Sequence, residues 1–314
     1  MSNEITASVI LPIYNAAETL DVCLSSLLSQ GRQDIEIVMV NDGSTDGSDA
    51  VCRRYAERDS RFRLVSQSNA GVSAARNRGL EEARGRVILF VDSDDRVDAG
   101  FADRMISALD GESELAVCGY YECFINGDCV PKDYGVGRVS RKRYALRMAH
   151  RPTENYYGVL WNKGFLRDVI DAARLRFDER SSYGEDEAFV LSYLPRIRSV
   201  TQLSDRLYYY SFDRADSLSN GRIDDAVRIE RTAYVYRNYV NFWRQLGCYK
   251  RYAPLVKYCG ARLYYNERRE IEPSSAERLY KSCLEDNGFT AADRRLFASI
   301  RAVRRMMEGK RRDE

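Results

Sequence analysis

The chain has 314 residues, of which 49 are basic and 47 acidic, so the net charge is +2, and 44% are apolar or aromatic. This composition excludes an intrinsically disordered chain, and the length exceeds that of a scaffold that needs disulfides or metal to fold. A general nucleic-acid-binding protein carries a basic excess over a whole domain, so we expect no nucleic-acid partner. Length alone predicts roughly two domains.

The sequence carries no mark of a membrane-spanning or secreted protein. Its strongest apolar run, at 87–91, is far shorter than the roughly 20 residues that span a bilayer. The first seven residues include Glu4 and lack the apolar core of a secretory signal, so we expect a cytoplasmic location. The eight cysteines form no C-x-x-C pair and His150 has no zinc-like neighbours, which predicts reduced cysteines packed as small hydrophobic side chains.

Short β-branched runs alternate with amphipathic helical patterns over the first 120 residues. Residues 8–13 predict a strand, followed by a helix on which Leu20, Leu24 and Leu27 share one face. The alternation continues with strands expected at 35–40, 62–66 and 86–91 and with helices near 47–59 and 72–83. Four βα units in a row indicate an α/β protein with a mainly parallel, doubly wound sheet.

The pattern changes after residue 115. A strand is expected at 115–124, a hairpin or mobile loop at 126–137, and an aromatic strand at 207–212. From about Asp224 the apolar residues step by threes and fours, which predicts helices. We therefore expect an α/β domain over 1–222 and a C-terminal helical region over 223–314.

The loops that follow the first four strands are the expected ligand site, because ligands of such sheets bind at the carboxyl ends of the strands. Asp92, Asp94 and Asp95 directly follow a buried-looking strand. Carboxylates packed this closely repel one another, and Mg²⁺ or Mn²⁺ would stabilise them while bridging to a substrate phosphate. The alternative is a solvated acidic turn, with Asp98 as a helix cap.

Two further acidic loops allow two interpretations each. Asp42 follows the second strand and offers a carboxylate to the N–H groups of a nucleobase, whereas Ser44 and its neighbours are good helix caps. The acids at 185–187 open a helical pattern. They supply either a catalytic base or only favourable charge at a helix N-terminus.

Five motifs in this order resemble the inverting family 2 glycosyltransferases, which have a GT-A fold. They are SVILPIYN at 8–15, VNDGSTDGS at 40–48, NAGVSAARNRG at 69–79, FVDSDD at 90–95 and GEDEAF at 184–189. The resemblance covers roughly residues 5–220. WNK at 161–163 and Y-x-Y-x-x-x-R-x-x-S at 208–217 resemble the bacterial surface-polysaccharide branch of the family.

The resemblance implies a Rossmann-like GT-A domain with a nucleotide-sugar half at about 1–125 and an acceptor half at about 126–222. It places Asp42 at the base, usually uracil, Arg76 and Asn77 near the diphosphate and pocket wall, and Arg214 in a segment that closes over the diphosphate. Asp94 and Asp92 match the D-x-D metal motif. The implied donor-binding residues are Pro12, Tyr14, Asn15, Asp42, Arg76, Asn77, Asp92, Ser93 and Arg214.

In the family's acidic motif the second acid is the base, which implies Asp186 here. The implied acceptor side includes Trp161, Lys163 and Glu185, although a lone tryptophan such as Trp161 is more often a core residue than a sugar platform. Many GT-A enzymes use a histidine as a further metal ligand, and His150 matches no such motif.

The resemblance, with the acidic residues that it matches, implies a metal-dependent, hexosyl-type inverting transferase that uses Mn²⁺ or Mg²⁺. It implies a nucleotide-sugar donor, with UDP as the expected nucleotide. The family, and not the residues, implies the acceptor, a saccharide or lipid-linked molecule of cell-envelope or capsular polysaccharide synthesis. The alternatives are a sugar nucleotidyltransferase and an inactive nucleotide- or glycan-binding protein. Six basic and three acidic residues at 301–314 allow weak peripheral contact with the inner face of the membrane, although we favour a solvated tail.

Overall fold

The computed structural model describes residues 4–109, 111–133, 135–151, 155–181, 184–212 and 225–267, with a few isolated positions beyond 273. The chain forms two compact units. One contains Met1–Ala145 and Asn155–Gly221, and the other contains Leu146–Glu154 and Arg222–Glu314. Across the described residues, none of the helices combines the length and the apolar character needed to cross a bilayer.

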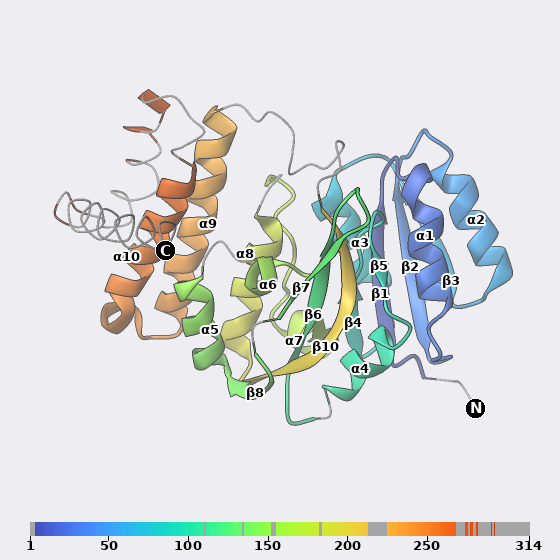
Figure 1. Cartoon of the computed structure of the whole chain (residues 1–314), viewed down its shortest axis with the longest axis horizontal. Coiled ribbons are helices and arrows are strands. Elements are labelled where there is room, and N and C mark those ends of the chain that lie inside the picture. The colour runs from blue at the N-terminus through green and yellow to red at the C-terminus, as the bar shows by residue number, and fades with distance from the viewer. Residues whose placement is uncertain are drawn as a thin grey trace, which may run out of the picture. The chain divides into compact units, whose positions relative to one another are not determined.

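The first unit is built on a ten-stranded mixed sheet (Figure 1) with the strand order β3-β2-β1-β4-β9-β6-β10-β5, while β7 pairs with β6 and β8 with β10. The strands are β1 (Ala7–Ile13), β2 (Ile35–Asp42), β3 (Phe62–Gln67), β4 (Val87–Phe90), β5 (Arg96–Val97), β6 (Leu115–Cys123), β7 (Cys129–Lys132), β8 (Gly137–Ser140), β9 (Lys163–Leu166) and β10 (Ser199–Ser211). The first four strands are parallel, as predicted. Beyond them β9 runs antiparallel to both β4 and β6.

Helices follow the strands of the first unit and include the expected amphipathic ones. They are α1 (Ala17–Leu28), α2 (Ser48–Arg58), α3 (Val72–Glu82), α4 (Phe101–Ser107), α5 (Arg141–His150), which continues into the second unit, α6 (Asn155–Gly158), α7 (Arg167–Ala172), α8 (Glu185–Tyr193) and the 3₁₀ turn η1 (Leu194–Arg196). Leu20, Leu24 and Leu27 of α1 are fully buried, which confirms the predicted face. The core is therefore formed by β1, β2 and β4 with the apolar faces of these helices.

Helix α3 lies very close to β1. A Cβ atom added at Gly79 would lie 2.3 Å from Cγ2 of Ile10, a separation that no side chain tolerates without movement. The absence of a side chain at Gly79 thus lets the helix settle onto the strand. This contact positions Arg76, which lies about one turn earlier in α3, near the carboxyl ends of the strands.

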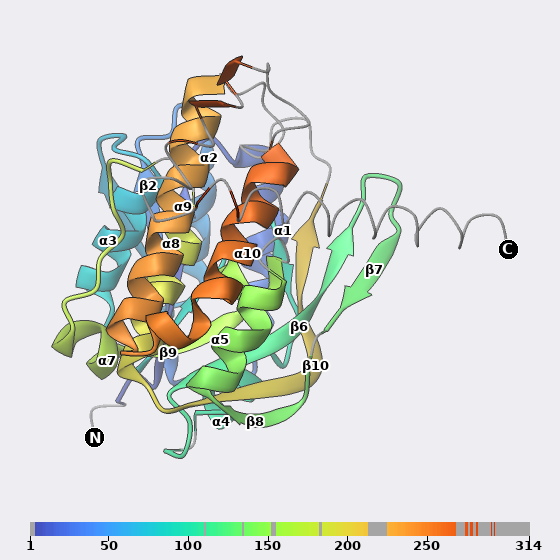
Figure 2. The same cartoon turned by 90° about the vertical axis from the view of Figure 1, so that its left-hand side faces the viewer.

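The second unit contains α9 (Asp225–Gln245) and α10 (Tyr249–Glu267), which lie side by side (Figure 2). The apolar residues predicted to share one face of the first of these helices are all buried: Ile229, Ala233, Tyr236, Val240 and Trp243. The Trp243 ring packs 5.0 Å from that of Tyr252 on α10. The helical pattern expected after residue 224 is therefore confirmed for the described residues.

The cysteine prediction was right for four buried residues and wrong for one pair. Cys23, Cys52, Cys118 and Cys259 are buried thiols. Cys123 and Cys129, however, form a disulfide. The reason is local, because residues 115–132 form the β6–β7 hairpin and its antiparallel register sets these two residues directly opposite each other.

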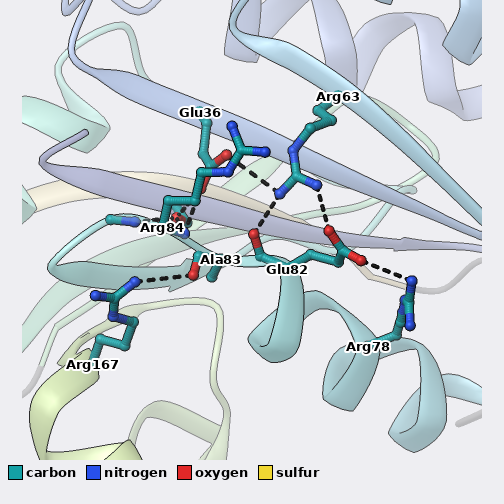
Figure 3. Close-up of polar contacts among 9 residues, drawn as sticks. Glu36, Arg63, Arg78, Glu82, Ala83, Arg84 and Arg167 are labelled. Carbon is teal, nitrogen blue, oxygen red and sulfur yellow. Dashed lines mark hydrogen bonds and ion pairs between the residues drawn. The ribbon is translucent and has the colours of Figure 1, made fainter. Parts of the chain in front are cut away.

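A polar network at the amino ends of the strands joins the end of α3 to β2 and β3 (Figure 3). Arg63 donates to the Glu82 carboxylate at 2.6 Å and approaches Glu36 at 3.5 Å, while Arg78 pairs with the other Glu82 oxygen at 2.8 Å. Glu36 is 4% exposed and accepts the Arg84 backbone N–H at 2.7 Å. It also accepts the Ser8 hydroxyl at 2.6 Å, so its carboxylate joins two strands to the end of a helix.

Glu36→Ala is expected to lower the free energy of unfolding by about 1–3 kcal/mol, because the buried Ser8 hydroxyl loses its acceptor and the Arg84 N–H keeps only its longer bond to Ser8 Oγ at 3.1 Å. Glu82→Ala is the matched control. That carboxylate pairs with two arginines but is 26% exposed, so its loss is expected to cost at most about 1 kcal/mol. Urea unfolding of both variants measures the difference, and equal losses would contradict the prediction.

Candidate functional site

Two loops at the carboxyl edge of the sheet are joined by hydrogen bonds. The side-chain oxygen of Asn15 accepts the Thr45 backbone N–H at 2.8 Å, and the backbone N–H of Asn15 donates to the Ser44 hydroxyl at 3.1 Å. Asp46 and Ser48 accept the N–H groups of the first turn of α1, at 2.8 and 2.9 Å. The residues that sequence reasoning offered as helix caps thus brace the neighbouring loop.

The residues predicted for the nucleotide pocket differ in exposure. Pro12 is buried in β1, whereas Tyr14 is 51% exposed and Asn15 is exposed beside it. Ser93 is partly exposed, and its carbonyl accepts the Thr19 hydroxyl at 3.1 Å. Tyr14 is therefore the side chain of this group with the most surface available to a ligand.

The Asp42 carboxylate, which we predict to contact a base, is bonded to its own neighbouring loop in the structure. It is 3% exposed and accepts the Gln67 amide at 2.8 Å together with the N–H groups of Ala70 and Gly71 at 2.9 and 2.8 Å. Burial of a carboxylate requires such donors, and the chain itself supplies them. Asp42 therefore holds the loop after β3 in place.

The acidic loop after β4 is tied to the end of β10. Asp95 is 2% exposed and accepts the Tyr208 hydroxyl and the Ser211 N–H, both at 2.7 Å. The same Tyr208 hydroxyl accepts the Asp92 N–H at 3.1 Å, and the Asp94 carbonyl accepts the Ser211 hydroxyl at 2.7 Å. Burial, reinforced by Asp94 and Asp92, raises the pKa of Asp95 well above its usual range.

The residues present fit a partial cation site. Within the described residues, no three His, Cys, Asp or Glu side chains converge into a complete metal site. Both oxygens of the Asp95 carboxylate accept hydrogen bonds from β10. The side chain of Asp92 remains 28% exposed, and Asp94 is partly exposed. Hard carboxylate oxygens of this kind suit a divalent ion whose other ligands come from phosphate and water.

Arg76 joins the acidic loop to the start of α8. Its side chain is 6% exposed, and one terminal nitrogen donates to Asp186 at 2.7 Å and to Glu185 at 2.9 Å. The other nitrogen donates to Asp92 at 3.1 Å. Burial lowers the pKa of Arg76, but the three carboxylates outweigh burial, so the guanidinium stays charged. One cation thus holds together acids that lie about 90 positions apart in the sequence.

The carboxyl group of Asp186 has an altered acidity. Burial raises its pKa to about 8, with Glu185 and Asp92 acting in the same direction and with Arg76 and Lys163 opposing. A carboxyl group with a pKa near the working pH exchanges protons readily, which is the property required of a general base. Its side chain keeps 22% exposure, so a ligand can approach it.

Asn77, which we predict near the diphosphate and pocket wall, makes its hydrogen bonds to the segment that precedes α8. Its amide nitrogen donates to the Phe177 carbonyl at 3.0 Å and to Glu179 at 2.8 Å, and its oxygen accepts the Phe177 N–H at 2.8 Å. The residue is 7% exposed. Its hydrogen bonds therefore hold the segment that precedes α8.

Trp161 and Lys163, which we predict on the acceptor side, are also buried. The Trp161 ring is 3% exposed and stacks on Tyr208 at 4.5 Å. The Lys163 ammonium is fully buried and donates to the carbonyls of Tyr156 and Val159 at 2.8 and 2.6 Å. Burial lowers the pKa of Lys163 to about 7. Trp161 therefore packs against the tyrosine that bonds to the acidic loop, and Lys163 holds the backbone carbonyls of residues 156 and 159.

Two remaining predictions have different outcomes. Arg214 lies outside the described residues. His150 is exposed, and its ring lies 2.9 Å from the Leu146 carbonyl of its own helix. Sequence reasoning missed the roles of Asp95 and Tyr208, although the aspartate adjoins the D-x-D motif and the tyrosine begins the quoted Y-x-Y pattern.

Comparisons with known proteins agree on the family and the fold. The sequence model described as Glycosyl transferase family 2 matches residues 8–173. The chain is 35% identical over 206 residues to the uncharacterized glycosyltransferase EpsJ of Bacillus subtilis. The matched residues cover 65% of this chain and 60% of EpsJ. It is 28% identical over 313 residues to the uncharacterized glycosyltransferase YibD of Escherichia coli, which is 95% of this chain and 88% of YibD. The chain thus spans less than two thirds of the length of EpsJ.

The fold is shared with a solved structure. The crystal structure of S. aureus TarS 1-349 in complex with UDP-GlcNAc superposes with a TM-score of 0.71 at 18% identity, over 90% of this chain and 82% of that chain. This likeness, together with the mixed sheet and the C-terminal helices, confirms the predicted GT-A fold class.

Proposed function

Because the chain belongs to glycosyl transferase family 2, we propose that it is an inverting, metal-dependent enzyme that transfers a sugar from a nucleoside diphosphate donor. We propose UDP as the nucleotide, since a protein of the same fold is known in complex with UDP-GlcNAc. The proposed acceptor is a saccharide or lipid-linked molecule of surface polysaccharide synthesis. Residues 301–314, the basis for peripheral membrane contact, lie outside the described part of the chain.

One observation carries the proposal, namely the bonding of Asp92 and Asp186 to the same guanidinium of Arg76. The two carboxylates are separated only by these two hydrogen bonds and the width of one planar group. A donor sugar whose phosphates lie beside Asp92 would therefore have its anomeric carbon within the neighbourhood of Asp186. We propose that Asp186 then lies on the face of that carbon opposite the leaving phosphate, as a single displacement requires.

The proposed reaction is one in-line step. The acceptor oxygen forms a bond to the anomeric carbon while the bond from that carbon to the phosphate oxygen breaks on the opposite face. Asp186 takes the proton of the acceptor hydroxyl, and the electron pair of the broken bond leaves with the nucleoside diphosphate. Removal of that proton by a positioned carboxylate typically contributes about 10²- to 10⁴-fold in rate.

Arg76 has two roles in this proposal. It keeps the Asp186 carboxylate oriented. It also supplies positive charge next to the loop after β4, where the departing phosphates of the donor would gain negative charge. Asp94, with Asp92, would hold a divalent cation that neutralises charge on the departing phosphates. Tyr208 and Ser211 keep the acidic loop in place through their bonds to Asp95.

The experiment is donor turnover with UDP-GlcNAc, UDP-glucose, UDP-galactose and GDP-mannose in the presence of Mn²⁺ or Mg²⁺, followed by release of free nucleotide. We expect turnover of at least one UDP-sugar, its loss on chelation with EDTA, and recovery when the metal is restored. Asp94→Asn is expected to lower the rate by about 10²-fold, since charge stabilisation of the leaving group weakens.

Asp103→Asn is the control for this experiment, because Asp103 is an exposed acid on α4 that pairs with Arg32. It is expected to leave turnover unchanged. Full activity in the presence of EDTA would exclude the metal. An absence of turnover with every donor would count against the transferase itself.

A further inference from the structure

A row of contacting aromatic rings is formed by side chains of β10 and of the segments just before β9 and just after β6 and β10. Figure 2 shows β6 and β10 beside β7. We call Trp161, Tyr208, Tyr210, Phe212 and Phe124 the aromatic row. Trp161 stacks on Tyr208 at 4.5 Å and on Tyr210 at 5.3 Å. Phe212 continues the row with edge contacts to Tyr210 at 6.2 Å and to Phe124 at 5.3 Å.

The row begins at the candidate active site and ends in solvent. Tyr208, at its inner end, is fully buried and bonds to Asp92 and Asp95. Tyr210 and Phe124 are partly exposed, and Phe212 is 39% exposed. The outer rings are thus the accessible part of the row, and a ligand that reaches past Tyr208 can contact them.

A pair of opposite charges lies on the same face of the sheet. Glu122 is the register partner of Tyr210, and Lys132 is the partner of Tyr120. Because paired residues of neighbouring strands point to the same side, these charges lie on the face of the row, Glu122 beside Tyr210 and Lys132 one pair further in. The Lys132 ammonium and the Glu122 carboxylate are 3.1 Å apart, with side-chain exposures of 30% and 16%.

We infer that the outer rings Tyr210, Phe212 and Phe124, with Glu122 and Lys132, form a subsite for a pyranose ring of the acceptor saccharide. This inference rests on the proposed transferase function and adds to it the place and chemistry of acceptor recognition. Binding sites for small molecules combine aromatic walls with a few oriented polar groups, and this face has both. The apolar face of a pyranose packs on a ring, and its hydroxyls bond to a carboxylate and an ammonium.

The charges favour a saccharide over a lipid chain as the occupant. An alkyl chain over Glu122 and Lys132 would remove both from water without giving them new hydrogen bonds. Sugar hydroxyls replace the lost water because each donates to a carboxylate and accepts from an ammonium. A saccharide therefore makes apolar contacts with the rings and hydrogen bonds with both charges, whereas a hydrocarbon makes only the apolar contacts.

The direct test is calorimetric titration of the full chain with a panel of pyranose disaccharides and with their octyl glycosides, in the absence of a donor. A separate titration with UDP measures binding at the proposed donor site. We expect wild type to bind at least one disaccharide, and Phe124→Ala with Phe212→Ala to weaken that binding about tenfold. Glu122→Gln is expected to weaken it as well, while UDP affinity stays unchanged in every variant.

Val22→Ala is the matched control, since Val22 is an exposed apolar residue on α1 outside the row, with 58% exposure. Unchanged disaccharide affinity in the double variant, or no binding of any disaccharide by wild type, would overturn the subsite. Binding of octyl glycosides alone, with no contribution from the sugar, would overturn the saccharide assignment in favour of a lipid. Failure of the transferase proposal differs from these outcomes, because it would appear as absent UDP binding and absent donor turnover.

Discussion

Asp186→Asn is expected to lower the rate of sugar transfer by about 10²- to 10⁴-fold while the affinity for UDP stays at the wild-type value. Asparagine keeps the size of the side chain and can still accept one hydrogen bond from Arg76. It cannot take a proton from an acceptor hydroxyl at neutral pH. The loss should therefore fall on kcat, measured with saturating donor, and not on nucleotide binding measured by titration.

The pH profile provides a second readout of the same residue. Because burial raises the pKa of Asp186 to about 8, the base is mostly protonated at pH 7 in the free enzyme. The active form is the ionised one, so kcat/KM is expected to rise with pH up to about 8 and then level off. Residual activity of Asp186→Asn should lack this rise.

Glu185→Gln is the matched control, because Glu185 shares the same Arg76 nitrogen and adjoins Asp186. Its replacement removes a charge that raises the Asp186 pKa, so the rise in kcat/KM should move to lower pH with little loss of maximal rate. A larger loss of kcat in Glu185→Gln than in Asp186→Asn would assign the base to Glu185 instead.

The periodic parts of the fold could be predicted from the sequence because each depends on neighbouring residues. The strands β1 to β4 and the helices between them follow the apolar pattern, and so does the buried face of α9. The disulfide between Cys123 and Cys129 could not be predicted in this way. It depends on the register of the β6–β7 hairpin, which spacing alone does not fix.

The acids of the site could be found by motif, but their partners could not. Arg76, Asp92 and Asp186 meet only because α3, the loop after β4 and the start of α8 converge at one edge of the sheet. The same limit applies to the hydrogen bonds of Asp42 and Asn77, which the motifs do not predict. A polar residue in a ligand motif can equally well satisfy the backbone of its own loop, and the sequence does not tell which donors reach it first.

Arg76→Met is expected to lower the transfer rate at pH 7 by more than about tenfold and to move the rise in kcat/KM to higher pH. Methionine fills much of the same space without charge. Arg76 is the strongest of the groups that lower the pKa of Asp186, so its loss raises that pKa further. Each additional unit reduces the ionised fraction at pH 7 about tenfold.

The variant also tests whether Arg76 acts on the site or only on stability. Arg63→Met is the matched control, since Arg63 likewise links two carboxylates, those of Glu36 and Glu82, at the opposite edge of the sheet. Urea unfolding should show a loss of stability in both variants, because each removes a cation from a carboxylate that is buried or partly buried, although Glu82 keeps its pair with Arg78 in Arg63→Met. Only Arg76→Met should move the pH profile. A profile that stays at the wild-type pH in Arg76→Met, or one that moves equally in Arg63→Met, would mean that the guanidinium does not set the proton affinity of Asp186.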